Sequence, residues 1–337
     1  MTVYFSTFIA GFGGLVLDLM KRDRGSARNI RLFDGAVVYE SDSRPEDMEK
    51  IGYFNNSFIV LREFGYGTGF GREILDRMVA DLVSDSRNLS IPFFPMKSFK
   101  IFSSLENTLA KPDGKLIYRL VELIKGKTGK NYGSSSANGE FWIIQRSEGV
   151  GFFMLRVTYS RKKLEKGELR PELANLLCRL SEPEEDDIFI DPFCGSGAIP
   201  LERSKMLSFK GIFATDRDES LTNGLRNKVR KIKTSKMQRS FFVKKLDFFS
   251  NSFDNNFFDV MVTDPPWGIY QELEEGFYPR FLGEASRILE PNGRLVLLTA
   301  REICLGEGPR IGSLTLERHF DILVSGKKAR VHLLAKE

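Results

Sequence analysis

The second half of the sequence predicts an α/β fold of the doubly wound type, a mostly parallel seven-stranded sheet with helices on both faces. Strand and helix patterns alternate from residue 171 onward, a glycine-rich loop follows the first strand, and two apolar runs end the chain. Strictly alternating strands and helices place neighbouring strands in parallel. The two final runs, separated by a short turn, would complete the sheet as an antiparallel hairpin. The first half predicts a less regular α+β region.

Each element of the second half has its own signal. The first helix begins at Pro171, and proline in a first turn is a start signal because its missing N–H would have no partner there. Short apolar runs bounded by glycine, asparagine or aspartate are typical of strands. The expected strands are 188–190, 211–215, 241–243, 259–263, 294–299, 320–324 and 329–334, and the expected helices are 171–180, 198–206, 219–233 and 277–289.

The length of 337 residues is about twice that of a typical domain and favours two units. The sequence pattern changes after residue 166, so we divide the chain into 1–166 and 167–337. The first part should begin with a strand over 3–9 and a helix near residue 14. Further strand candidates are 36–39 and 57–61, helix candidates are 71–82 and 116–124, and 141–145 with 151–158 form a hairpin candidate.

Composition argues against several classes of protein. The three cysteines lie far apart without a CxxC pair, which disfavours a disulfide framework and a cysteine zinc site. Both histidines, His319 and His332, lie near the C-terminus, so neither a histidine triad nor a multi-histidine metal site is expected. The apolar start of the chain lacks the preceding basic residues of a secretory signal. We therefore expect a cytoplasmic protein that spans no membrane and holds no metal.

Positive charge is concentrated in two segments. Residues 97–166 carry a net charge of +8, against +5 for the whole chain, and mix lysines with aromatic residues such as Phe99, Phe102, Tyr132 and Phe141. Lysines attract phosphates and aromatic rings stack on exposed bases, so this segment suits a polyanion. A solvated basic face over a core of aromatic residues explains it equally well. A second run, 226–245, holds nine positive residues and no acidic one, and fits either a helix end or a substrate contact.

The segment 191–198, with the sequence DPFCGSGA, follows a strand and opens a helix. Gly195 and Gly197 permit a tight turn in which the backbone approaches a ligand closely. Pro200 occupies the place of the third glycine of a dinucleotide fingerprint, and no lysine follows as in a P-loop. The acidic Asp191 at the strand end would repel a pyrophosphate and suits a cationic ligand.

Acidic residues follow four of the expected strands, at 191, 216, 247 and 264. Asp216 can accept both ribose hydroxyls of a nucleoside, and Asp247 can accept from an adenine amine beside the apolar edge of Phe248. A single aspartate at a strand end is more often a turn or helix cap, but four in register favour a binding site. S-adenosylmethionine, which carries a sulfonium and an ammonium and no phosphate, matches this set.

The loop Asp264–Pro265–Pro266–Trp267 follows the strand over 259–263. Two prolines make it rigid and keep Pro265 extended. The Asp264 carboxylate and the carbonyl of Asp264 or Pro265 could each accept one N–H of a planar exocyclic amine and aim its lone pair at a methyl donor. Trp267 offers a flat face for the base. The alternative is a rigid turn capped by aspartate beside a packed tryptophan.

The two motifs, DPFCGSG at 191–197 and TDPPWG at 263–268, resemble the amino-methyltransferase branch of the Rossmann-fold, S-adenosylmethionine-dependent enzymes. The segment GELRPELANLLCRLS at 167–181 resembles the same region of RNA guanine-N2 methyltransferases with a THUMP domain. The resemblance implies a ferredoxin-like and THUMP-type RNA-binding region over 1–166 and a Rossmann-fold methyltransferase domain over 167–337. It also implies that the enzyme methylates the N2 amine of a guanine in tRNA. Trp267 departs from the family, in which tyrosine or phenylalanine is commoner.

The expected site follows from these motifs and charges. The expected catalytic residues are Asp264, Pro265, Pro266 and Trp267. The expected cofactor-binding residues are Asp191, Phe193, Gly195, Ser196, Gly197, Asp216, Arg217, Asp247 and Phe248. The expected substrate-binding residues are Trp267, Lys125, Lys127, Lys130, Arg161, Lys162 and Lys163.

Two alternatives stay open. The same motifs occur in rRNA and DNA amino-methyltransferases, so the substrate could be another nucleic acid. The protein could also bind RNA without catalysis, through a degenerate methyltransferase domain, although both loops are intact. Cytosine-C5 methylation is not expected, because Cys194 in the glycine loop is poorly placed to attack a base. We expect a monomer.

Overall fold

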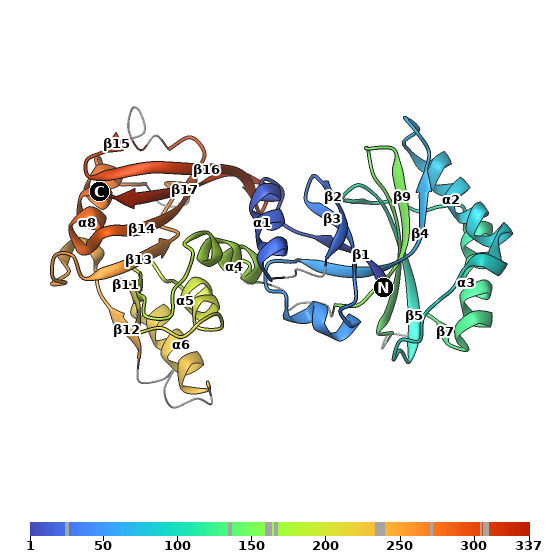
Figure 1. The fold of residues 1–337 in the computed structure, drawn as a ribbon, viewed down its shortest axis with the longest axis horizontal. Helices are drawn as coiled ribbons and strands as arrows, with labels where there is room; N and C mark the ends of the chain where they lie inside the picture. The colour runs from blue at the N-terminus through green and yellow to red at the C-terminus, as the bar shows by residue number, and fades with distance from the viewer. Residues whose placement is uncertain are drawn as a thin grey trace. The chain divides into compact units, whose positions relative to one another are not determined.

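The computed structural model describes residues 1–23, 27–133, 137–158, 164, 168–232, 240–269, 272–303, 305 and 310–337. The chain divides into two units (Figure 1). The N-terminal unit comprises Met1–Thr7 with Met20–Arg161, and the C-terminal unit comprises Phe8–Leu19 with Lys162–Glu337. The main division thus lies at 161 and 162, and the short segment Phe8–Leu19 belongs to the C-terminal unit, which the sequence did not indicate.

The N-terminal unit is built on a nine-stranded sheet in the order β2-β3-β1-β4-β9-β8-β5-β6, with β7 paired to β5. Its strands are β1 (Thr2–Thr7), β2 (Arg28–Phe33), β3 (Ala36–Ser41), β4 (Asn56–Gly65), β5 (Ser98–Leu105), β6 (Thr108–Leu109), β7 (Asn131–Tyr132), β8 (Gly139–Gln145) and β9 (Val150–Arg156). Its helical elements are η1 (Pro45–Lys50), α2 (Arg72–Ser84), η2 (Ser86–Asn88) and α3 (Gly114–Thr128). Helix α1 (Gly13–Asp23) crosses from one unit to the other. The predicted hairpin of β8 and β9 is confirmed.

The core of the N-terminal unit lies between the sheet and helices α2 and α3, which Figure 1 shows side by side. Leu75 and Leu82 of α2 and Leu120 of α3 are fully buried in it. Phe99 and Phe141 are fully buried there too, so these two aromatic residues of the +8 segment pack in the core and are not available to bases. For these two rings, the alternative of a solvated basic face over a core of aromatic residues is right.

The C-terminal unit contains an eight-stranded sheet in the order β12-β11-β10-β13-β14-β17-β16-β15. Its strands are β10 (Ile188–Asp191), β11 (Gly211–Asp216), β12 (Phe241–Lys245), β13 (Phe258–Thr263), β14 (Leu289–Ala300), β15 (Arg310–Ile311), β16 (Leu314–Val324) and β17 (Lys327–Lys336). Its helical elements are α4 (Pro171–Leu180), α5 (Ala198–Arg203), α6 (Glu219–Arg230), η3 (Phe248–Ser250) and α8 (Phe277–Ile288).

The predicted doubly wound fold is confirmed, with one correction to its strand number. Strands β10 to β14 pair in parallel, and the hairpin β16–β17 joins β14 in antiparallel fashion, as expected. The sheet gains an eighth strand because the two residues of β15 pair with the start of β16, which begins at Leu314 and not at 320. This short pairing reaches only Leu314 and Thr315 at the start of β16.

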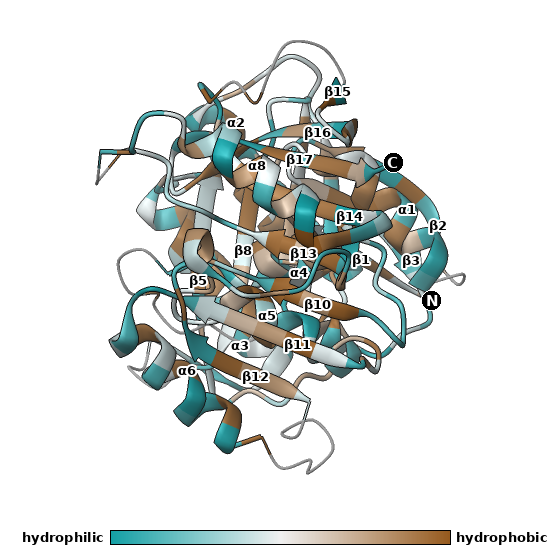
Figure 2. Cartoon of the chain, turned by 90° about the vertical axis from the view of Figure 1, so that its left-hand side faces the viewer, coloured by the Kyte–Doolittle hydropathy of each residue, from teal (hydrophilic) through white to brown (hydrophobic). Residues whose placement is uncertain are grey.

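Burial on both faces explains why the central strands read as continuous apolar runs. In β13, Val260, Met261 and Val262 are fully buried, and Ile190 of β10 is buried beside them. Figure 2 shows β10 and β13 in the hydrophobic colour, whereas α6 is largely hydrophilic. The strand order reverses between β10 and β13, and such a switch point leaves a crevice at the carboxyl ends of the strands.

The segment Phe8–Leu19 is part of the C-terminal unit through packing of its own side chains. Phe12 and Val16 are fully buried. The ring of Phe12 lies 5.1 Å from that of Phe320 on β16. The sequence predicted this stretch as part of the first region, because a pattern of local propensity carries no information about a partner 300 residues away.

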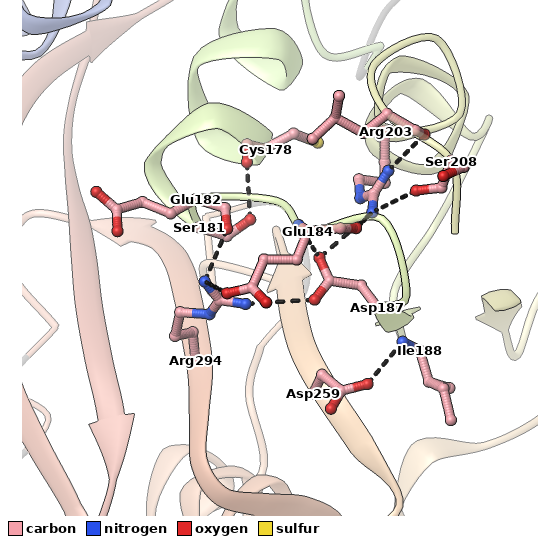
Figure 3. A network of polar contacts seen from close by, with 11 residues as sticks. Cys178, Ser181, Glu182, Glu184, Asp187, Ile188, Arg203, Ser208, Asp259 and Arg294 are labelled. Atoms are coloured by element: carbon pink, nitrogen blue, oxygen red, sulfur yellow. Dashed lines mark hydrogen bonds and ion pairs between the residues drawn. The ribbon is translucent and has the colours of Figure 1, made fainter. Parts of the chain in front are cut away.

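A buried ion network anchors β10 at its amino end, away from the crevice (Figure 3). Asp187 accepts from Arg203 at 3.3 Å through Oδ2 and from Arg294 at 3.3 Å through Oδ1. Arg203 has no exposed surface, and Asp187 is 3% exposed. Arg203 also donates to the carbonyls of Glu184 and Leu207, so both of its terminal nitrogens have backbone acceptors. Burial raises the pKa of Asp187, against the effect of both arginines.

Candidate active site

A cavity of about 330 Å³ lies at the carboxyl ends of β10, β11 and β13. Eight of the nine expected cofactor-binding residues line it, together with Asp264 and Pro266 of the expected catalytic loop. The eight are Asp191, Phe193, Gly195, Ser196, Asp216, Arg217, Asp247 and Phe248. The remaining wall includes Leu169, Phe249, Glu272, Leu273, Glu274 and Phe277. Gly197, Pro265 and Trp267 do not line the cavity.

The glycine loop is held from two sides. The Gly195 N–H donates to Asp216 Oδ2 at 2.9 Å, which ties the loop after β10 to the end of β11. Lys228 on α6 donates to the Ser196 carbonyl at 2.9 Å. The basic run over 226–245 therefore contributes at least one residue that supports the glycine loop. The sequence had indicated only a helix end or a substrate contact for this run. Asp216 Oδ1 accepts from the Asp218 N–H, and each of its oxygens keeps a lone pair for a ligand.

Asp191 is buried at the head of the cavity and links β10 to β13. Its Oδ1 accepts from the Thr263 hydroxyl at 2.8 Å and from the Phe193 N–H at 3.3 Å. Burial raises the pKa of Asp191 well above its ordinary value, and the nearby Asp264 and Asp216 raise it further. A cationic ligand would relieve this repulsion, whereas a phosphate would add to it.

Asp247 both caps a short helix and lines the cavity, the two roles that its position after a strand allowed. Its Oδ1 accepts from the Phe249 N–H at 2.9 Å, which begins the short helix η3. Its side chain also lines the cavity, so a cap does not exclude a ligand contact. Phe193 packs against Phe248 and Phe277, with ring centroids 5.6 Å and 6.0 Å apart. The cavity thus has an aromatic wall facing an acidic one.

The catalytic loop follows β13 directly. Burial raises the pKa of Asp264 to about 7, and a hydrogen bond from Trp267 acts against this rise. The Trp267 indole Nε1 donates to Asp264 Oδ1 at 2.7 Å. From α8, the Tyr278 hydroxyl donates to the Pro266 carbonyl at 3.0 Å. The loop is therefore fixed by its prolines and by hydrogen bonds at two points.

Several site residues were missed from the sequence. Glu272, Glu274 and Phe277 line the cavity, and Tyr278 holds the catalytic loop. The one available signal was the aromatic pair Phe277–Tyr278 at the start of an expected helix shortly after the DPPW loop. A helix that starts there places its first turn beside the end of β13, but only the fold makes that clear.

Gly197 has a different role from the one expected. It precedes α5 with φ of +91°, and a Cβ at this position would lie 2.2 Å from Leu225 Cδ1 of α6. Gly195, with φ of +50°, has no atom within 4 Å of its ideal Cβ. Gly197 therefore serves close packing between the loop and α6, and Gly195 serves the turn itself.

The pair offers a matched test of this assignment. We expect Gly195→Ala to cost about 1–2 kcal/mol of stability, from backbone strain alone. Gly197→Ala should cost about 2–4 kcal/mol, because overpacking against Leu225 adds to the strain. Urea unfolding without cofactor measures both. Leu225→Ala should remove much of the excess cost of Gly197→Ala; equal costs for the two glycine variants would contradict the packing role.

Of the expected substrate lysines, the three that the structure describes, Lys125, Lys127 and Lys130, do not line the cavity. Lys125 and Lys127 lie in the last turn of α3 and Lys130 just beyond it, all in the N-terminal unit. Lys125 pairs with Glu122 at 2.9 Å, and Lys127 is exposed. Arg161, Lys162 and Lys163 lie outside the described residues. A role of these residues in substrate binding stays a prediction.

The described residues hold no group of three or more His, Cys, Asp or Glu side chains suited to a metal ion. Within the described ranges, helices that are both long and apolar enough to cross a bilayer are absent. Cys178 and Cys194 are buried free thiols, and burial raises the pKa of each.

The strand order, the glycine loop and the acidic strand ends define the C-terminal unit as a Rossmann-type methyltransferase domain. Residues 159–309 match the UPF0020 family, described as an RMKL-like methyltransferase domain, so this segment is similar to that family. S-adenosylmethionine is the cofactor that the cavity fits, because the wall is acidic and aromatic and contains a single basic residue, Arg217, among those described.

Two curated relatives carry methyltransferase names, and a solved structure shares the fold. The chain is 30% identical over 182 residues to the Bos taurus tRNA (guanine(6)-N(2))-methyltransferase THUMP3, covering 50% of this chain and 36% of that protein. It is 28% identical over 157 residues to the Methanocaldococcus jannaschii tRNA (guanine(10)-N2)-dimethyltransferase, covering 45% and 43%. The chain thus spans less than half the length of either relative. The crystal structure of TrmN from Thermus thermophilus matches with a TM-score of 0.79 at 20% identity, covering both chains completely.

Proposed function

We propose that this protein transfers a methyl group from S-adenosylmethionine to the exocyclic N2 amine of a guanine in tRNA. The observation that carries the proposal is the position of Asp264, which lines the same cavity as the expected cofactor-binding residues. The names of the relatives, tRNA guanine-N2 methyltransferases in cattle and in an archaeon, support the choice of substrate.

The residues of the cavity suit each part of the cofactor. Asp191 and the backbone of the glycine loop would receive the methionine end, Asp216 the ribose hydroxyls, and Asp247 with Phe248 the adenine. S-adenosylmethionine, when bound, supplies a methyl group on a positively charged sulfur. The acidic wall favours that positive charge and disfavours nucleotides that carry phosphates.

Asp264 would prepare the amine for attack. One carboxylate oxygen and a carbonyl of the loop accept the two amine N–H groups, which aligns the nitrogen lone pair with the methyl carbon. As the N–C bond forms and the S–C bond breaks, positive charge develops on the nitrogen, and the carboxylate stabilises it. The amine then releases a proton, and a carboxyl with a pKa of about 7 can accept it at neutral pH. The Pro266 carbonyl accepts from Tyr278, and the carbonyl that accepts from the amine would be that of Asp264 or Pro265.

The direct test is methyl transfer from labelled S-adenosylmethionine to three acceptors: tRNA, rRNA and duplex DNA. Labelled N2-methylguanosine in digested tRNA would support the proposal. Labelling of rRNA or DNA alone would favour the other amino-methyltransferases. If isothermal titration detects no binding of S-adenosylmethionine, the protein is a binding protein with a degenerate domain.

The N-terminal unit would hold the RNA. Lys127 is exposed at the end of α3, Tyr118 on the same helix is 67% exposed, and Tyr132 on the neighbouring β7 is 46% exposed. These side chains combine phosphate attraction with rings available for stacking. Because phosphate contacts release counterions, tRNA affinity should fall steeply with salt.

Charge reversal tests this surface. We expect Lys127→Glu/Lys130→Glu to weaken tRNA binding and to reduce the slope of log affinity against log salt by about 1–2. Fluorescence anisotropy at several salt concentrations measures both. Lys50→Glu, at an exposed lysine of η1 in the same unit, is the control and should change the slope little. A slope equal to that of the wild type in the double variant would remove this surface from the proposal.

A further inference from the structure

Trp267 contacts Asp264 through its polar edge. Its Nε1–H donates to Asp264 Oδ1 at 2.7 Å, and the tryptophan does not line the cavity, although Asp264 does. Among the described residues, the second oxygen of Asp264, Oδ2, accepts no hydrogen bond. The geometry therefore divides the carboxyl group into an oxygen held by the protein and an oxygen available to a substrate.

This contact fixes a direction that prolines alone do not fix. Pro265 and Pro266 restrict the backbone, but χ1 and χ2 of Asp264 stay free to rotate. A tryptophan N–H can only donate, so it binds a carboxylate oxygen and holds the group in one orientation. Tyr278 fixes the adjoining backbone at the Pro266 carbonyl, 3.0 Å away, so both the side chain and the main chain of the loop are clamped.

We propose that Trp267 is a positioning residue, whose indole N–H holds Asp264 Oδ1 and leaves Oδ2 to accept the N–H of the target amine. This inference rests on the proposed amine methylation and deepens it. It assigns Trp267 a role that a phenylalanine at this position cannot perform, because phenylalanine has no donor. Stacking of the base on the indole ring is a separate role and is not required for this one.

The same hydrogen bond should control the protonation of Asp264. Burial favours the neutral acid and raises the pKa to about 7, while the Trp267 N–H stabilises the carboxylate. The titratable groups coupled to Asp264 are Asp191 at the end of β10 and Tyr278 on α8, and the charge of Asp264 raises the pKa of each. The carboxylates of Asp216, Asp247, Glu272 and Glu274 line the same cavity. Like charges disfavour the carboxylate, whereas the Trp267 N–H and the Arg217 cation, which lines the same cavity, favour it.

Kinetics of Trp267→Phe give the first test. The substitution keeps a ring and removes the N–H, so single-turnover methyl transfer at pH 7 should fall about tenfold. The rising limb of the pH–rate profile should move up by about one pH unit, because loss of the donor raises the pKa of Asp264. KM for tRNA should change much less than the rate.

The second tryptophan of the chain provides the matched control. Trp142, in the N-terminal unit, also donates its Nε1–H to a carboxylate, Glu140, at 3.1 Å. Trp142→Phe makes the same chemical change away from the cavity. It should leave both the rate and the pH profile at wild-type values.

A spectroscopic readout does not depend on activity. In Trp142→Phe protein, Trp267 is the only tryptophan, so its fluorescence reports on Asp264. We expect an emission change with an inflection near pH 7, and we expect Asp264→Asn in the same background to abolish it.

Each outcome decides the inference. Titration of the fluorescence together with a shifted pH profile in Trp267→Phe supports it. A flat fluorescence titration, or a Trp267→Phe enzyme with the wild-type rate and pH profile, overturns it and leaves stacking as the role of the ring. If the wild type methylates no nucleic acid, the proposed function fails, and the fluorescence titration alone then decides whether Trp267 and Asp264 are coupled.

Discussion

Asp264→Ala is expected to reduce methyl transfer by about 10²- to 10⁴-fold while S-adenosylmethionine still binds. The substitution removes the acceptor of the amine N–H, the charge that stabilises the developing ammonium, and the base that takes its proton. Single-turnover transfer to tRNA measures the loss, and isothermal titration measures cofactor binding. A variant with most of the wild-type rate would refute the proposed mechanism.

Asp264→Asn tests whether an amide of the same shape can replace the carboxylate. The asparagine oxygen would accept the Trp267 N–H, so its NH₂ group would face the target amine, and two donors would then oppose each other. We therefore expect Asn to be nearly as inactive as Ala. Recovery of activity in Asp264→Asn would mean that Trp267 does not hold Oδ1 during the reaction.

Thermal melting at different pH values tests whether the expected losses of activity in the Asp264 variants come from unfolding. The folded state keeps the Asp264 proton up to about pH 7, whereas the unfolded state releases it near 3.8. Between these values the folded protein binds more protons, so ionisation of Asp264 reduces stability as pH rises and the full cost is present above about pH 7. Asp264→Asn should thus melt at a higher temperature than the wild type at pH 8, with a smaller difference at pH 5.

Asp187→Ala is expected to lower the free energy of unfolding by about 3–5 kcal/mol. It leaves Arg203, which has no exposed surface, with a buried charge and no carboxylate partner (Figure 3). Urea unfolding at pH 7 measures the loss. Because Asp187 lies at the amino end of β10 and the cavity at the carboxyl end, the folded fraction should bind S-adenosylmethionine with wild-type affinity.

Two controls make this test specific. Glu184→Ala removes another carboxylate that contacts Arg294, but its side chain is 74% exposed, so it should cost at most about 1 kcal/mol. Asp187→Leu/Arg203→Met removes both buried charges, and should recover most of the stability lost in Asp187→Ala. If the double variant is less stable than Asp187→Ala, the cost comes from packing and not from the unpaired charge.

The main outline of the site could be predicted because its residues are local in sequence. Asp191 and Asp216 end parallel strands and Asp264 directly follows one, and parallel strands bring their carboxyl ends to one edge. The roles of Gly197 and Trp267 could not be predicted in the same way. Gly197 is required by Leu225 on another helix, and Trp267 acts through its N–H as well as its ring. Such roles depend on contacts that a motif does not contain.

The fold was predictable to a similar degree. The strands and helices of the second half could be predicted because each apolar run there is compatible with one type of secondary structure. In the first half, β5 (Ser98–Leu105) was missed: it mixes lysine and serine with its apolar residues, and Ser103 and Ser104 are nevertheless buried. The Ser103 hydroxyl donates to the Ala110 carbonyl, so its burial is compensated by a partner seven residues later. Polar residues satisfied in this way weaken the periodic signal of a strand.

The place of Phe8–Leu19 in the C-terminal unit affects how the protein can be dissected. A fragment starting at residue 162 would lack the ring that packs on Phe320 and would expose that side chain to water. An isolated catalytic half therefore needs the short peptide supplied in trans or fused by circular permutation, and a deletion series that ignores this would report misfolding as loss of catalysis.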